Sequence, residues 1–209
     1  MSRVIVSLGS GRQAHLLQIA ARSFRRYAER HGYELALHTE VADPTRPAPW
    51  SKIVLLRRLA KKHELLLWLD ADAVIVDGSV DIASELEEGR FLHLVEHETK
   101  EGRMPNSGVM LIRGGAESIS FFDDVYAQED LIEHRWWENA AICRLLGYQL
   151  DPPAPAAPTP LLVEQTKLIS PRWNSIPDAP AASPRIRHYP GYSLKVRAAL
   201  MLRDELLRR

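Results

Sequence analysis

The stretch Leu65-Leu66-Leu67-Trp68-Leu69-Asp70-Ala71-Asp72 decides the fold of this chain. It begins with five consecutive apolar residues, and so short an unbroken run is typical of a central parallel strand that is covered on both faces. Two carboxylates follow directly after the apolar run. Because ligands of open α/β sheets bind beyond the carboxyl ends of the strands, the stretch predicts a buried strand that ends in a ligand site.

Weaker signals on both sides of this run extend the prediction to the whole chain. An apolar strand at 4–8 stops at Gly9-Ser10-Gly11, and the helix that follows ends before Gly32, a typical C-cap residue. Strands and helices alternate at first and mix later, which predicts an α/β fold with a mostly parallel mixed sheet flanked by helices. We expect strands at 4–8, 34–39, 65–69, 91–95, 109–112 and 186–188, helices at 13–31, 50–62, 117–127, 133–146 and 194–209, and a proline-rich loop at 151–160.

Length and composition restrict the class of protein. A chain of 209 residues suits one α/β domain, which we place at residues 1–209. Lys+Arg and Asp+Glu both number 27, whereas proteins that follow nucleic-acid phosphates usually carry a basic excess, so we expect no nucleic-acid partner. The lone Cys143 cannot form an internal disulfide. Since the sequence shows neither a signal peptide nor an apolar run near the ~20 residues of a membrane span, we expect a cytoplasmic protein.

The aspartate pair predicts a divalent metal site. Asp70 and Asp72 lie two residues apart, so both carboxylates can offer hard oxygen ligands to Mg²⁺ or Mn²⁺, while water and phosphate oxygens fill the other positions. His188 is a candidate third ligand because neutral imidazole binds Mn²⁺, and Lys195 at the start of the last helix can neutralise phosphate. The alternative is an ordinary strand-ending turn, where Asp is common, with an unrelated histidine.

Small polar residues provide candidate contacts to a sugar nucleotide. Asn106 and Ser107 precede an apolar strand and can bind sugar hydroxyls, and Gly108 lets a ligand approach the backbone closely. At the end of the first strand, Ser7 and Leu8 can line a pocket for a nucleotide base. Taken alone, each segment also fits an ordinary turn beside a strand.

Two adjacent tryptophans, Trp136 and Trp137, precede Glu138 and offer candidate contacts to a sugar that receives a transferred group. Aromatic faces are common platforms for sugar rings, and a carboxylate can orient an acceptor hydroxyl or stabilise positive charge at an anomeric carbon. The alternative places the tryptophans in the core beside a solvated glutamate. The last helix, 194–209, mixes basic with apolar residues, which fits either docking on the domain or peripheral contact with an anionic membrane.

Taken in chain order, these motifs together resemble the retaining glycosyltransferases of the GT-A fold, in particular the galactosyl-, mannosyl- and xylosyltransferases of fungi and plants and the glycogenin-like family. The resemblance runs from Val4 to Lys195, and its motifs are Trp50-Ser51-Lys52, Leu67-Trp68-Leu69-Asp70-Ala71-Asp72-Ala73, Asn106-Ser107-Gly108-Val109-Met110-Leu111-Ile112-Arg113, and His188 with Gly191 and Lys195. It implies a single GT-A-like (Rossmann-like) domain with a nucleotide-sugar and metal half at 1–115 and an acceptor half with a C-terminal helix at 116–209. The short chain is similar to a compact bacterial form of the family.

The resemblance also implies roles for individual residues. It makes Asp70, Asp72 and His188 the ligands of Mn²⁺ or Mg²⁺. It assigns the remaining contacts to the donor to Lys52, Ala71, Asn106, Ser107, Gly108, Gly191 and Lys195. The pair Glu138-Asn139 stands where relatives often carry Asp-Gln at a helix start, so we expect catalysis to involve this pair together with the two aspartates. Trp173-Asn174 is similar to the Trp-Asn that precedes the metal-binding histidine of glycogenin-like enzymes.

The implied reaction transfers a hexosyl or pentosyl group, with retention, from a nucleoside diphosphate sugar, taken to be a UDP-sugar, to a hydroxyl of a carbohydrate or glycoconjugate. One alternative is a haloacid dehalogenase-type phosphohydrolase, whose signature is also an apolar strand followed by Asp-x-Asp, with Asp123-Asp124 as its later acidic pair. Against it, about seventy residues precede the motif here, and no Thr follows Asp72. A second alternative, left open by Glu138, is a catalytically degenerate nucleotide-sugar-binding protein.

Overall fold

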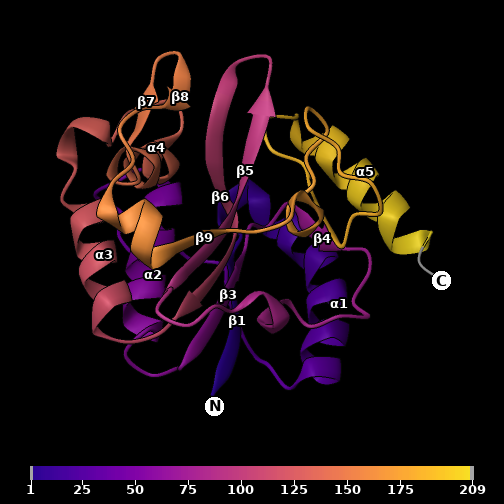
Figure 1. The fold of residues 1–209 in the computed structure, drawn as a ribbon. Coiled ribbons are helices and arrows are strands. Elements are labelled where there is room, and N and C mark those ends of the chain that lie inside the picture. The colour runs from indigo at the N-terminus through magenta and orange to yellow at the C-terminus, as the bar shows by residue number, and fades with distance from the viewer. Residues whose placement is uncertain (1, 208–209) are drawn as a thin grey trace.

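The computed structural model describes residues 2–207, which form a six-stranded sheet between two layers of helices (Figure 1). In spatial order the strands are β2 (Glu34–His38), β1 (Arg3–Leu8), β3 (Leu65–Leu69), β6 (Gly102–Arg113), β5 (Leu92–Thr99) and β9 (Thr166–Leu168). The pairs β1–β2, β1–β3 and β5–β9 are parallel, and β6 is antiparallel to both of its neighbours. Only β6 therefore runs against the other five strands, and the predicted mostly parallel mixed sheet is confirmed.

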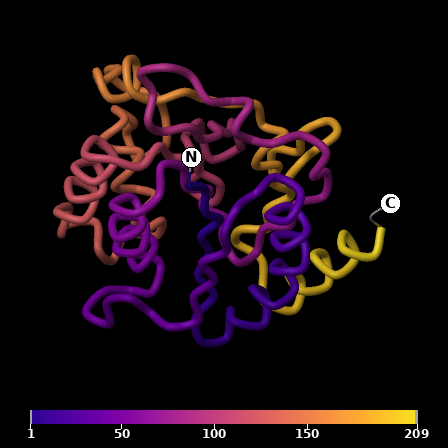
Figure 2. The backbone as a smooth tube through the Cα atoms, turned by 90° about the horizontal axis from the view of Figure 1, so that it is seen from below, coloured from indigo at the N-terminus to yellow at the C-terminus, as the bar shows by residue number. Residues whose placement is uncertain are grey.

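The helices divide between the two faces of the sheet, as the view from below shows (Figure 2). They are α1 (Ala14–His31), α2 (Ser51–Leu59), α3 (Ala116–Tyr126), α4 (Trp137–Leu145) and α5 (Leu194–Leu206). Helices α1 and α5 pack on one face, and α2, α3 and α4 on the other. Successive side chains of a strand point to opposite faces, so Leu66 and Trp68 of β3 join one core while Leu67 joins the other. Burial on both faces explains the unbroken apolar run.

The sheet reverses its winding direction between β1 and β3. The chain leaves β1 through α1 and adds β2 on one side, then returns through α2 and adds β3 on the other side of β1. Such a switch point opens a crevice beyond the carboxyl ends of the two strands, and ligands of α/β sheets bind there. Asp70 and Asp72 follow β3 at this place.

Two small sheets were not predicted as such. Strand β4 (Ala73–Ile75) pairs antiparallel with β10 (Ile186–His188), and this pairing places His188 opposite Ala73. Strands β7 (Tyr148–Leu150) and β8 (Pro153–Pro155) form a hairpin that enters the expected proline-rich loop.

Some predicted boundaries shift. The helix expected at 133–146 begins only at Trp137, whose φ of 44° is incompatible with a continuous helix through this residue. The strand expected at 109–112 is the end of the longer β6, which forms a hairpin with β5.

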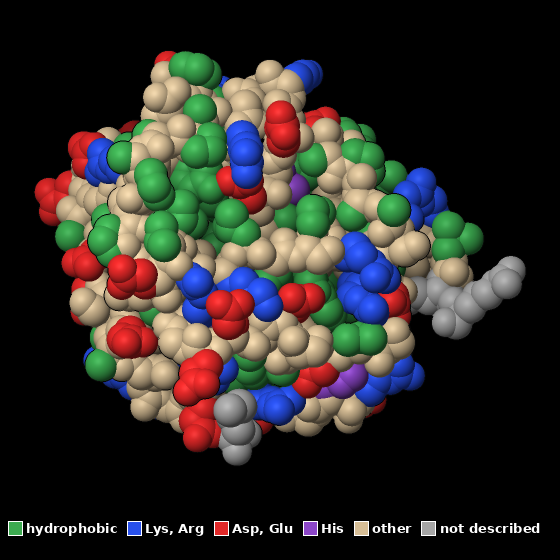
Figure 3. Space-filling model, viewed as in Figure 1, with side chains coloured by type: hydrophobic (Ala, Val, Ile, Leu, Met, Phe, Trp, Pro, Cys, Tyr) green, Lys and Arg blue, Asp and Glu red, His purple; other side chains and the backbone are tan. Residues whose placement is uncertain are grey.

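The surface has no single dominant charge. Acidic and basic side chains lie side by side over the face shown in Figure 3, in keeping with a formal net charge of zero for the chain. Between residues 2 and 207, none of the helices combines the length and the apolar character that crossing a membrane requires.

Candidate active site

A cavity of about 650 Å³ opens at the switch point of the sheet. Segments that are far apart in the sequence line it, among them the end of β1 with the turn after it, the start of α2, the Asp70–Asp72 turn, the end of β5 with the first half of β6, the start of α4, the turn after β10, and α5. The cavity therefore lies where the parallel strands β1 and β3 end, and it is bordered by the β5–β6 hairpin and by the turn that follows the separate β4–β10 pair.

Three potential metal ligands meet in this cavity. Single ligand atoms of Asp70, Asp72 and His188 lie within 4.8 Å of one another. His188 Nε2 is 3.3 Å from Asp72 Oδ1 and 3.6 Å from Asp70 Oδ2. Ligands about 2.1 Å from one cation stand roughly 3 Å apart when they occupy neighbouring octahedral positions, so these donors need only small shifts to share an ion. Carboxylate oxygens are ligands that suit Mn²⁺ and Mg²⁺, and the imidazole adds a nitrogen donor of the kind that transition metals accept.

Each aspartate is oriented through its other oxygen. Asp70 Oδ1 accepts a hydrogen bond of 2.7 Å from Trp68 Nε1 and lies 3.1 Å from Lys52 Nζ. Asp72 Oδ2 accepts one of 2.8 Å from Arg197 Nη1. Burial raises the pKa of Asp72, but His188 and Arg197 beside it outweigh this effect and lower the pKa to about 2. The two carboxylates thus present one oxygen each to a common point, and Asp72 is ionised at neutral pH.

Lys52 is buried between Asp70 and Glu138, and it contacts the Asp70 oxygen that does not face His188. Its Nζ lies 2.7 Å from Glu138 Oε1 and donates to the hydroxyl and the carbonyl oxygen of Ser107, at 3.2 and 3.3 Å. Burial alone lowers the pKa of an ammonium group, but Asp70 and Glu138 outweigh it, so the pKa of Lys52 is above its ordinary range. A charged Lys52 therefore fixes the carboxylates on both sides of it.

Glu138 lies at the inner end of the tryptophan pair. Its side chain is buried, and burial raises the pKa of its carboxyl, an effect that Lys52 opposes. Trp137 borders the cavity with 40% of its surface exposed, and its positive φ is a strained conformation for a bulky residue. Such strain is concentrated at functional sites, and here it turns an indole outward at the cavity rim while Glu138 points inward.

The predicted site residues of β6 and α4 contact one another. Asn139 Oδ1 accepts from the backbone N–H of Ser107 at 2.7 Å, and its Nδ2 donates to the carbonyl oxygen of Pro105 at 3.2 Å. Both ends of this side chain thus bind the backbone of β6, and its catalytic role stays a prediction. A Cβ added to Gly108 would lie 2.1 Å from His188 Cε1, so only glycine lets the imidazole pack against the strand here.

Most of the site residues predicted from the sequence border the cavity. They are Leu8, Lys52, Asp70, Ala71, Asp72, Asn106, Ser107, Gly108, Trp137, Glu138, Asn139, His188 and Gly191. Ser7 and Lys195 do not border it. Along β1 the side chains alternate between faces, so Leu8 reaches the cavity whereas the fully buried Ser7 points to the other face. Lys195 is exposed on the outer side of α5.

Sequence reasoning missed Arg197, which α5 points into the cavity toward Asp72. Helical spacing could have indicated it. Leu194, Arg197, Met201 and Asp204 follow one another at three- and four-residue intervals, and this face of α5 packs inward.

Comparisons with known proteins agree with this geometry. A family model described as the galactosyl transferase GMA12/MNN10 family matches residues 4–108. A glycosyltransferase involved in glycosylation of the major capsid of PBCV-1 superposes with a TM-score of 0.76 at 17% identity, covering 97% of this chain and 100% of the other. The galactosyltransferase LgtC, in complex with donor and acceptor sugar analogs, gives 0.61 at 13% identity, with coverage of 98% and 94%.

A more distant neighbour is mouse xyloside xylosyltransferase 1, with a TM-score of 0.54 at 9% identity and coverage of 90% and 97%. No curated protein sequence matches the chain. At such low identities the structural neighbours show the fold alone, and they confirm the predicted GT-A architecture.

Proposed function

Because the chain belongs to the galactosyl transferase GMA12/MNN10 family and is a glycosyltransferase of the GT-A fold, we propose that it transfers a hexosyl or pentosyl group from a UDP-sugar to a hydroxyl of a carbohydrate or glycoconjugate, with retention. The observation that carries this proposal is the convergence of Asp70, Asp72 and His188 in the cavity beyond β3. This family membership argues against the alternative of a haloacid dehalogenase-type phosphohydrolase.

The three converging residues would hold Mn²⁺ or Mg²⁺, which neutralises the charge that develops on a departing diphosphate. Lys52 and Arg197 have complementary tasks, since each binds one aspartate oxygen and leaves the other directed at the common point. We assign contact with the diphosphate to Arg197, which borders the cavity, in place of Lys195, which lies on the outer side of α5.

Asn106 Oδ1 already accepts two hydrogen bonds, from Gly108 N–H and from Asn174 Nδ2. Its Nδ2 group is therefore the end of this side chain that would donate to a donor sugar. Ser107, whose hydroxyl binds Lys52, would lie next to the same sugar and couple its position to the buried charges.

We place the acceptor at the rim formed by the start of α4. Trp137 offers an exposed indole face for a sugar ring, and Glu138 lies behind it, where its buried carboxylate faces Lys52. This arrangement fits an acceptor half at residues 116–209. His188 and Arg197 also come from that half, so the site for the donor requires both parts of the chain.

Thermal unfolding with and without Mn²⁺ in a series of nucleotide sugars tests the proposal. A ligand present at 100 times its Kd stabilises the fold by about 2.7 kcal/mol, which raises the Tm of a chain of this size by roughly 5–10 °C. We expect such a rise for UDP-sugars only when Mn²⁺ is present, and none for Asp72→Asn. If no donor raises the Tm, the proposal is refuted. If a donor raises the Tm but a separate activity assay finds no turnover of it, the result would support the degenerate binding protein instead.

We further propose peripheral contact with an anionic membrane through α5, where lipid-linked acceptors would be met. Its exposed face carries apolar side chains, of which Leu206 is 83% and Leu207 69% exposed. Exposed cations lie on α5 and on the neighbouring α1: Lys195, Arg203, Arg22, Arg25 and Arg30. Apolar side chains among cations are the pattern of an interfacial helix.

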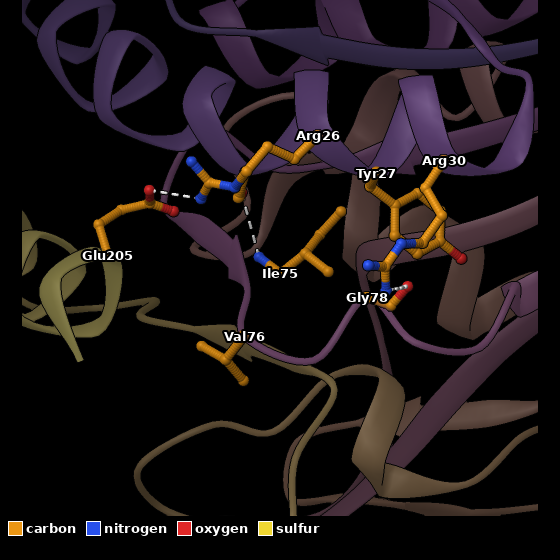
Figure 4. A pocket seen from close by; sticks show the side chains of 8 residues that line it. Arg26, Tyr27, Arg30, Ile75, Val76, Gly78 and Glu205 are labelled. Atoms are coloured by element: carbon orange, nitrogen blue, oxygen red, sulfur yellow. Dashed lines mark hydrogen bonds and ion pairs between the residues drawn. The ribbon is translucent and has the colours of Figure 1, made fainter. Parts of the chain in front are cut away.

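Beside α5, residues of α1, of β4 with the segment after it, and Glu205 line a second cavity of about 440 Å³ (Figure 4). Arg26 and Arg30 project over it from α1, and Arg26 forms an ion pair of 2.6 Å with Glu205 of α5. This ion pair joins the two helices, while Arg30 donates to the carbonyl oxygen of Gly78 at 3.3 Å.

Sedimentation with phosphatidylserine vesicles should therefore deplete the protein, and phosphatidylcholine vesicles should not. Leu206→Ser combined with Leu207→Ser should abolish the depletion, while Val163→Ser, an exposed apolar position outside α5, should leave it unchanged. Equal sedimentation of all variants would contradict membrane contact through α5. We also propose a cytoplasmic location for the enzyme.

A further inference from the structure

A row of amide groups connects the backbone of β6 to the imidazole of His188. The backbone N–H of Gly108 lies 2.9 Å from Asn106 Oδ1, and Asn174 Nδ2 lies 2.9 Å from the same oxygen. Asn174 Oδ1 lies 3.0 Å from His188 Nδ1. The row ends on the ring whose other nitrogen, Nε2, faces the two aspartates.

The direction of every hydrogen bond in this row follows from its first member. A backbone N–H can only donate, so the Asn106 atom beside Gly108 is the oxygen. The Asn174 atom beside that oxygen must then be the amide nitrogen, and it also lies 3.3 Å from the carbonyl oxygen of Asn106, which can only accept. The oxygen of Asn174 is left facing His188 Nδ1. Because this oxygen cannot donate, Nδ1 must carry a hydrogen.

This assignment matters because the surroundings of the ring compete for that hydrogen. Asp72 and Asp70 present carboxylate oxygens 3.3 and 3.6 Å from Nε2, and both would attract a hydrogen placed there. An imidazole nitrogen that carries hydrogen cannot bind a cation. Without an acceptor at Nδ1, the single hydrogen of the neutral ring would move to Nε2 and block the proposed metal position.

Asn174 is itself held rigidly. Its side chain is fully buried, and its carbonyl oxygen accepts a hydrogen bond of 2.6 Å from His97 Nε2. The next residue, Ser175, exchanges backbone hydrogen bonds with β10, to Ile186 and from His188, both at 2.9 Å. The acceptor and the ring that it binds are thus joined through the same stretch of backbone.

We infer that Asn174 is a positioning residue that keeps a hydrogen on Nδ1 of His188 and so leaves Nε2 to bind the cation. The inference rests on the metal site of the proposed function. It assigns Asn174 and the oxygen of Asn106 to support of the histidine, with no contact to the sugar donor through these atoms. Partners of this kind typically change metal affinity by 10–100-fold.

Side-chain ¹⁵N NMR of the metal-free protein at about pH 8, where free imidazole is neutral, reads the state of each ring nitrogen. The His188 signals are identified by their loss in His188→Gln. We expect a hydrogen on Nδ1 in the wild type and in Asn174→Asp, which keeps an acceptor oxygen. In Asn174→Leu we expect the hydrogen on Nε2. Calorimetric titration with Mn²⁺ should show a Kd about 10–100-fold higher for Asn174→Leu.

Trp173→Phe is the matched control, because it removes another buried hydrogen bond, from Trp173 Nε1 to Glu85 Oε1 at 2.8 Å, on the same turn. It should leave both the NMR signals and the Kd for Mn²⁺ unchanged. A bare Nδ1 in the wild type, or an unchanged Kd in Asn174→Leu, would overturn the inference. The wild-type spectrum decides the question even if Asn174→Leu does not fold. If the wild type binds no Mn²⁺, the proposed metal function fails, while the NMR readout still decides the role of Asn174.

Discussion

Replacing Gly108 by alanine should damage the metal site through a single methyl group. The added Cβ would lie 2.1 Å from His188 Cε1, 2.6 Å from Nδ1 and 2.9 Å from Asn106 Oδ1, whereas ordinary contacts begin near 3.4 Å. The ring would have to move away by roughly 1.3 Å, the difference between the 2.1 Å contact with Cε1 and an ordinary contact of 3.4 Å. Metal–ligand distances tolerate only about 0.2 Å, so His188 would no longer reach a cation shared with the aspartates.

Two effects of Gly108→Ala can be estimated separately. Overpacking a buried position costs about 1–3 kcal/mol of stability, so the variant should still fold. Loss of a partner behind a ligand already lowers metal affinity by about 10–100-fold, and displacement of the ligand itself should lower it at least tenfold.

Calorimetric titration with Mn²⁺ measures the second effect, and urea unfolding without metal measures the first. The matched control is Gly78→Ala, at which the nearest atom to the new Cβ, Tyr27 Cδ2, would be 3.3 Å away. It should bind Mn²⁺ as the wild type does. Wild-type Mn²⁺ affinity in a folded Gly108→Ala variant would refute the reasoning.

Three further predictions follow from the buried charges. Lys52→Met leaves two carboxylates without their shared cation, so the free energy of unfolding measured in urea should fall by about 3–5 kcal/mol, and adding Glu138→Gln should recover part of it. Arg197→Met should raise the KM for the sugar nucleotide about tenfold or more, while Lys195→Met should not change it; equal effects would contradict our assignment of the diphosphate contact. Burial lowers the pKa of His93 to about 4, so the unfolded chain takes up the proton first as the pH falls below about 6.5, and stability present above that pH should decrease by up to about 3 kcal/mol by pH 4. His93→Gln should weaken this acid dependence in urea unfolding, and an unchanged dependence would contradict it.

The central strand and its aspartates could be predicted because their signal is local. Five apolar residues followed by Asp-x-Asp specify burial on both faces and a place at the end of a strand, whatever the rest of the chain does. The convergence with His188 depends on a pairing between two three-residue strands, β4 and β10, that are more than 100 positions apart. So short a pairing leaves no periodic pattern, and His188 could be linked to the aspartates only through the ligand chemistry of imidazole and through the resemblance to a family.

The direction of individual side chains marks the limit of the sequence prediction. Ser7 and Leu8 are neighbours at the end of β1, and which of them faces the cavity depends on which face of the sheet α1 covers. Lys195 and Arg197 differ in the same way, because their roles depend on how α5 is rotated against the sheet. The amide row through Asn174 requires β6, the segment at Asn174 and β10 to come together, and no spacing in the sequence predicts this contact.

The release of UDP from a panel of UDP-sugars, measured with Mn²⁺ and again after addition of EDTA, tests the central claim most directly. We expect at least one donor to release UDP in the wild type with Mn²⁺, a loss of that activity with EDTA, and the same loss in Asp72→Asn, which keeps the size of the side chain. Release that continues at the wild-type rate in EDTA or in Asp72→Asn would contradict a metal-dependent transfer at Asp70, Asp72 and His188.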